Sequence, residues 1–247
     1  MSLSADGRLV LVRIKIERAK KHLGNLETDL VEFGDRHFGV FAAKGDPNVP
    51  GGLTSEFEMP RAYPIDMLSG AGDVIQNLRT ALDHLANQLV WVGTGQEPSR
   101  KIAFPIAESF DTYEADKVRK IKGVRSDAAK FIDDLKPYKG GNDALWRIHE
   151  LNNIDKHRML FTVSKDCYLF ADWLPTMMGQ RFPFLLKAQT PHFAGAFDLD
   201  IENDVEFQIA KALSDPAILK GDALLPSIRQ LVDYVDALSF TFKPFLE

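Results

Sequence analysis

The sequence predicts an α+β protein, mostly α, in which a helical bundle of about four main helices carries a β-hairpin insertion and a small antiparallel sheet. Three observations lead to this class. Long stretches repeat apolar residues at helical spacing, and short apolar runs bounded by Pro and Gly lie between them. The two kinds of element do not alternate in the regular order of a parallel sheet. With 247 residues, 45% of them hydrophobic, the chain can bury a sizeable core, and we expect a single domain over 1–247.

Four ranges have the pattern of long amphipathic helices: 8–33, 64–92, 142–160 and 222–242. Gly34 is a suitable stop for the first, Pro64 suits a first helical turn, and Asn142 or Asp143 is a suitable N-cap. Two shorter helices are expected at 108–120 and 126–135. The apolar positions assigned to the first helix are Leu11, Ile14, Ala19, Leu23, Leu26 and Leu30. The four long ranges make a natural four-helix set.

Two insertions are expected to hold the strands. Residues 36–62 surround a Gly- and Pro-rich loop and predict a β-hairpin. Residues 160–210 contain five short apolar runs, which predict the antiparallel sheet. These runs are 160–163, 167–173, 184–188, 197–199 and 205–209.

Charge and targeting signals restrict the compartment and the partners. The formal net charge of -5 does not favour a general basic grip on nucleic acid, although a local basic patch over 117–125 leaves one possible. The one cysteine, Cys167, permits no internal disulfide and suits a reducing compartment. The chain shows no signal peptide and no apolar window of about 20 residues. We therefore expect a bacterial-type cytoplasmic protein without a membrane partner.

Two polar stretches, Asn77–His84 and His149–Arg158, interrupt otherwise apolar helical patterns. At about 100° per residue, four side chains of each helix share a stripe. The first stripe is Asp73, Asn77, Thr80 and His84, and the second is Trp146, Glu150, Asn153 and His157. If the stripes face each other, they form a polar pocket. The residues that we assign to ligand binding are Asn77, Asp83, Glu150, Asn153, His157 and Arg158.

The residue types leave two other interpretations open. A single metal bound by His84, Glu150 and His157 is conceivable, since carboxylate and imidazole are metal ligands. The Glu-x-x-His pair of helical di-metal sites is broken here by Asn153, so no metal or cofactor is assigned. Alternatively, the polar residues form a buried hydrogen-bond network that only fixes the register of the helices.

Arg79 and His84 are separated by four residues. This spacing resembles the catalytic signature of HEPN-fold ribonucleases, which are helical-bundle proteins and often dimers. The resemblance implies metal-independent cleavage of RNA, with His84 as general acid or base and Arg79 stabilising the phosphorane charge. It also implies a homodimer. Thr80 departs from the family, which more usually has Asn, Asp or His directly after the Arg.

A wider resemblance covers residues 60–165. The blocks Asn77–Ala86, Phe104–Ile106 and Leu151–Arg158 look like those of a large group of uncharacterised bacterial proteins. That group carries no established activity, so the resemblance supports a shared site on two helices without naming its purpose. Two function hypotheses follow: a HEPN-like endoribonuclease, or a non-enzymatic helical-bundle module that binds a small ligand, a metal or a partner protein.

Overall fold

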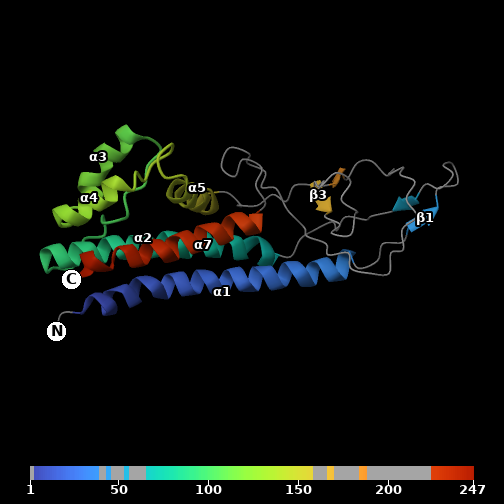
Figure 1. Ribbon diagram of the computed structural model, residues 1–247, viewed down its shortest axis with the longest axis horizontal. Coiled ribbons are helices and arrows are strands. Elements are labelled where there is room, and N and C mark those ends of the chain that lie inside the picture. Colours follow the sequence, from blue (N-terminus) through green and yellow to red (C-terminus); the bar gives the residue numbers. More distant parts are fainter. Residues whose placement is uncertain are drawn as a thin grey trace, which may run out of the picture. The chain divides into compact units, whose positions relative to one another are not determined.

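The computed structural model describes residues 3–38, 43–45, 53–55, 65–157, 166–169, 184–187 and 224–247, and most of the described residues are helical. Six α-helices lie in these ranges (Figure 1). They are α1 (Ala5–Phe38), α2 (Ile65–Thr94), α3 (Phe110–Lys120), α4 (Ser126–Asp134), α5 (Asp143–His157) and α7 (Leu224–Thr241), and a 3-10 turn covers Lys243–Leu246. No helix in the described ranges is long and apolar enough to cross a membrane.

The expected α+β class is wrong, because the described residues form a helical protein without the expected small sheet. Its six helices are the four long ranges and the two shorter ones that the sequence predicts. Extended pairing is confined to two separate two-stranded ribbons. One pairs β1 (Ala43–Gly45) with β2 (Leu53–Ser55), and the other pairs β3 (Asp166–Leu169) with β4 (Phe184–Lys187), both antiparallel. Ribbons this short do not make a sheet with a buried face.

The error has a physical cause. A short apolar run has no period that separates a strand from any other buried segment, and the expected sheet rested on five such runs. The runs at 160–163, 197–199 and 205–209 lie outside the described residues. The core is instead supplied by helices whose longer patterns are unambiguous.

The chain divides into two compact units. The first comprises Met1–Leu26, Leu68–Leu160 and Pro226–Glu247, and the second comprises Glu27–Met67 and Phe161–Leu225. The two predicted insertions, 36–62 and 160–210, belong to the second unit except for residue 160. That the whole chain is one domain stays a prediction. All the contacts described below lie within the first unit.

Three long helices of the first unit, α1, α2 and α7, run side by side (Figure 1). Arg8 Nη1 donates to Gln88 Oε1 at 3.0 Å, which ties the start of α1 to the end of α2. Arg13 and Lys20 of α1 both pair with Asp236 of α7, at 2.5 and 2.8 Å. Since His22 of α1 also meets Asp73 nearer the start of α2, these two helices are antiparallel. Lys243, just after α7, pairs with Asp6 at the start of α1 at 2.7 Å, which makes α1 and α7 antiparallel as well.

The buried positions of α1 follow the spacing of three and four residues that a packed helix requires. They are Leu9, Val12, Ile16, Ala19, Leu23 and Leu26. The sequence pattern wrongly placed Leu11 and Ile14 on this face, and their exposed fractions are 38% and 55%. Two apolar stripes overlap on this helix, and packing against its neighbours selects the one that is buried.

An extended segment, residues 102–108, crosses the helices and enters the core through Phe104, which is fully buried. The Phe104 ring meets Phe242 edge-on at 6.1 Å, and Phe131 of α4 meets Phe242 at 4.9 Å. Edge-to-face pairs of this kind add to the burial energy of the rings. This aromatic cluster joins the segment, α4 and the C-terminal end of the chain.

Candidate functional site

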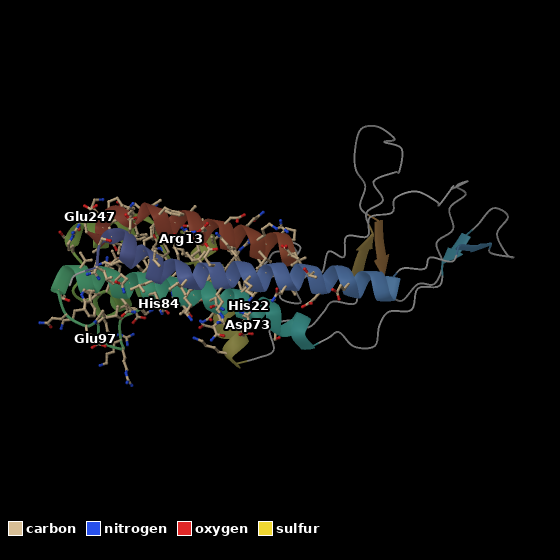
Figure 2. The ribbon with its side chains drawn as sticks, turned by 90° about the horizontal axis from the view of Figure 1, so that it is seen from below. Arg13, His22, Asp73, His84, Glu97 and Glu247 are labelled. Atoms are coloured by element: carbon tan, nitrogen blue, oxygen red, sulfur yellow. The ribbon has the colours of Figure 1, made fainter. Side chains whose placement is uncertain are left out.

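The first predicted stripe contacts α1 at both of its ends. His22 Nδ1 lies 3.6 Å from Asp73 Oδ2, and His84 Nδ1 lies 3.5 Å from the carbonyl oxygen of Leu11. Figure 2 shows His22 next to Asp73, with His84 farther along the same two helices. Asn77 donates at 2.7 Å to the carbonyl oxygen of Asp73 in its own helix. His84 and Asn77 are therefore engaged with α1 and α2 rather than with α5.

Arg79 and Asp83 lie on another side of α2 and hold Phe104 by its backbone. Arg79 Nη2 donates to the carbonyl oxygen of Phe104 at 2.9 Å. The Phe104 N–H donates to Asp83 Oδ1 at 2.9 Å, and the same Oδ1 lies 2.9 Å from Arg79 Nη2. One ion pair thus satisfies both backbone groups of a buried residue. This clasp is why the Phe104–Ile106 block can cross α2 without a strand partner.

The guanidinium of Arg79 is largely desolvated, with 8% of the residue exposed. Burial lowers the pKa of Arg79, and the charge of Asp83 opposes that shift. Arginine nonetheless stays protonated in a protein. Its Nη1 is buried and has no hydrogen-bond partner among the described residues. Arg79 is therefore a buried cation whose Nη2 is hydrogen-bonded and whose Nη1 has no partner among the described residues.

Two carboxyl groups lie close together at α5: those of Glu108 and Glu150. Trp146 Nε1 donates to Glu108 Oε1 at 3.2 Å. A hydrogen bond with Glu150 is the main reason that the pKa of Glu108 lies below its usual range. The carboxyl groups of Glu108 and Glu150 therefore lie within hydrogen-bonding reach of each other. Two carboxyl groups can be hydrogen-bonded only when one of them keeps a proton.

His149 is held in one tautomer by its own helix. Asn153 Nδ2 donates to His149 Nε2 at 3.2 Å, so Nε2 is the acceptor and Nδ1 carries the proton of the neutral ring. Burial lowers the pKa of His149 to about 4, and the positive charges of Arg79 and Lys120 act in the same direction. The ring is therefore neutral at pH 7. Its Nδ1 is buried and, like Arg79 Nη1, has no hydrogen-bond partner among the described residues.

These two nitrogens, which we call the donor pair, are Arg79 Nη1 on α2 and His149 Nδ1 on α5. The charge of Arg79 helps to lower the pKa of His149, so the guanidinium lies near the ring. Lys120 Nζ contributes from α3 and donates to the carbonyl oxygen of Ile106 at 3.3 Å. The donor pair thus lies among α2, α5 and the extended segment 102–108.

The predicted site residues divide into two groups. The structure places Arg79 and Asp83 in the clasp on α2, and Glu150 and Asn153 beside Glu108 and His149 at the α5 side of the same interior. It does not bring His84 or Asn77 there. His157 is the last residue of α5 and its side chain lies outside the described part, as does Arg158.

Sequence reasoning did not select Glu108 or His149 as site residues. Each had a signal: His149 borders the second stripe, and Glu108 follows the Phe104–Ile106 block by two positions. His149 directly precedes Glu150, so the helical spacing does not place it on the second stripe, and it was not selected. Tertiary structure adds Glu108, since no helix periodicity relates a loop residue to α5.

A second close contact brings α2 against α5. A Cβ atom on Gly72 would collide with the carboxylate of Asp155, so the glycine lets this side chain lie directly against α2. Burial raises the pKa of Asp155, and the nearby charge of Asp73 adds to the effect. Among the described residues, no group of three or more His, Cys, Asp or Glu side chains is placed to hold a metal. Of the three conceivable metal ligands, His84 lies against α1 rather than beside Glu150, and the side chain of His157 is not described.

No protein-family model, curated protein or solved structure matches this chain. The resemblances to HEPN ribonucleases and to the bacterial group therefore stay predictions. Any functional proposal has to rest on the residues of the site themselves.

Proposed function

We propose that the chain is a non-enzymatic helical-bundle module that binds a small polar ligand between α2 and α5. The observation that carries this proposal is the donor pair, two buried N–H groups without acceptors among the described residues. Leaving a buried donor unsatisfied costs roughly 1–3 kcal/mol, and native proteins keep few such groups. A ligand that supplies acceptors to both donors offsets that cost.

The hydrogen bonds around the donor pair favour binding over a purely structural network. A network that only fixes helix register is most stable when every buried member is satisfied. Here Asp83 accepts a hydrogen bond from the Phe104 N–H, and Asn153 donates one to His149 Nε2. Neither of these bonds involves Arg79 Nη1 or His149 Nδ1. The surrounding bonds hold the two side chains in place with the two nitrogens unused.

A thermal-shift screen of the full chain against a library of small polar metabolites tests this function. We expect at least one compound to raise the Tm, because a ligand that binds only the folded state stabilises it. His149→Phe keeps the ring volume and removes the donor, so it should abolish the shift. His22→Phe is the matched control on α1 and should keep it. A library without any stabilising compound, or a shift that survives His149→Phe, contradicts the proposal.

A HEPN-like ribonuclease is the second candidate, with RNA as substrate and a second copy of the chain as partner in a bacterial cytoplasm. The observation in its favour is that Arg79 and His84 lie on one helix of a helical unit. Incubation of the full chain with RNA tests it directly. Cleavage that is lost in His84→Ala and kept in His22→Ala supports the enzyme. Cleavage that persists in His84→Ala, or none at all with the native chain, excludes this assignment.

A further inference from the structure

We propose that the ligand of the donor pair is a small oxyanion, which accepts hydrogen bonds from Arg79 Nη1 and from the Nδ1–H of His149. The inference rests on the proposed binding function and adds the chemical class of the ligand. Formate, nitrate and bicarbonate are the simplest members of that class, because each presents two or more oxygens from a single small centre.

The first argument is local charge. Arg79 carries a permanent charge, and the carboxylate that the described residues pair with it, Asp83, also accepts the Phe104 N–H. The positive charges of Arg79 and Lys120 both act on the His149 ring, and Lys120 is itself paired with Asp116 at 3.0 Å. Both unused groups are N–H donors, which call for an acceptor, and one of them belongs to a guanidinium cation. Low dielectric strengthens the attraction for an anion there.

The second argument is preorganisation. The Arg79 side chain is held by Phe104 and Asp83 through one nitrogen, which leaves Nη1 in a defined position. Asn153 holds the His149 ring from the Nε2 side. Because both side chains are already ordered, the entropy cost of fixing them does not reduce the binding free energy. Even a ligand with few atoms can then bind measurably.

The third argument concerns ligand charge and size. His149 is neutral at pH 7, so it contributes a hydrogen bond without a charge, and Arg79 is already paired with Asp83. This balance suits a monoanion better than a dianion, whose second charge would be desolvated without a counter-charge. Both donor atoms are also fully buried, which favours a ligand of a few atoms over a bulky one.

The test compares formate with formamide, a neutral molecule of nearly the same size and shape. Each is titrated into the full chain while the Tm and the ring nitrogen signals of the histidines are followed by NMR. We expect formate to saturate, to raise the Tm and to move the His149 signal. We expect formamide at the same concentration to do neither. A bound anion should also raise the pH midpoint of the His149 titration, since a nearby negative charge favours the protonated ring.

Two variants locate the anion. Arg79→Lys keeps the positive charge and one donor for the clasp but lacks a second nitrogen, and His149→Phe removes the other donor. Each should weaken formate binding at least tenfold, whereas His22→Phe should bind like the native chain. If Arg79→Lys does not fold, as judged by circular dichroism, His149→Phe decides alone.

The outcomes separate the two proposals. If formamide or a neutral library compound binds at His149 and no anion does, the oxyanion inference is overturned and the binding function stands. If neither kind of molecule binds, both are overturned. If formate binds equally well to native chain and variants, the anion sits elsewhere and the inference is again wrong.

Discussion

Replacing Asp83 by alanine should destabilise the protein by about 3 kcal/mol, because one carboxylate serves two buried partners. Oδ1 accepts from the Phe104 N–H at 2.9 Å and faces Arg79 Nη2 at 2.9 Å. Leaving the buried N–H unsatisfied costs roughly 1–3 kcal/mol, and losing a hydrogen bond to a charged group costs about 1.5–3 kcal/mol. The Asp83 side chain is 32% exposed, so water can refill part of the site, and we take the lower half of the sum.

Urea denaturation followed by circular dichroism measures this free energy of unfolding. For a unit of this size, 3 kcal/mol also corresponds to a fall in Tm of about 6–12 °C. Asp83→Asn keeps an acceptor for Phe104 and removes only the charge, so it should lose roughly half as much. Asp134→Asn is the control: its ion pair with Lys130 is exposed, and its loss should change stability by less than about 0.5 kcal/mol. If Asp83→Ala unfolds within 0.5 kcal/mol of the native chain, the clasp does not stabilise the segment.

Three further predictions concern pH, close helix approach and the core. The pKa of His149 is about 4 when folded and 6.5 when unfolded, so the unfolded chain alone takes up this proton between those values. Stability should therefore fall by roughly 2 kcal/mol as pH drops from 6.5 to 4, after allowance for partial exposure, and His149→Phe should flatten that part of a urea-denaturation pH series. A Cβ on Gly93 would collide with the backbone oxygen of Gly123, whereas one on Gly24 meets nothing within 4 Å. Gly93→Ala should cost about 1–3 kcal/mol and Gly24→Ala should stabilise by roughly 0.5–1 kcal/mol; equal melting temperatures for the two would refute this. Phe242→Ala should cost about 3–5 kcal/mol in the same urea assay, since the ring is fully buried, and a loss under 1 kcal/mol would show that the aromatic cluster collapses without penalty.

The long helices could be predicted from the sequence because their period is sustained over many turns. The range 64–92, for example, corresponds to α2, Ile65–Thr94, and 222–242 corresponds to α7, Leu224–Thr241. The β content could not be judged in the same way, because a run of four or five apolar residues carries no helical or strand period. The α+β prediction failed for that reason.

The site shows the same division at the level of single residues. The sequence by itself determined which stretches are polar, and four of the selected residues, Arg79, Asp83, Glu150 and Asn153, lie around one interior. It could not determine which side of α2 faces α5. The helical spacing placed His84 and Asn77 on one side of α2. In the structure this side contacts α1, where His84 meets the carbonyl oxygen of Leu11.

Tertiary structure alone decided that the clasp binds Phe104 and that Glu108 meets α5, because both depend on where a non-helical segment crosses the helices. It also decided that Arg79 and His149 each keep an unused buried nitrogen. The physical reason is general. Periodicity reports the direction of a side chain from its own helix axis, whereas desolvation and hydrogen-bond satisfaction depend on every element packed around it.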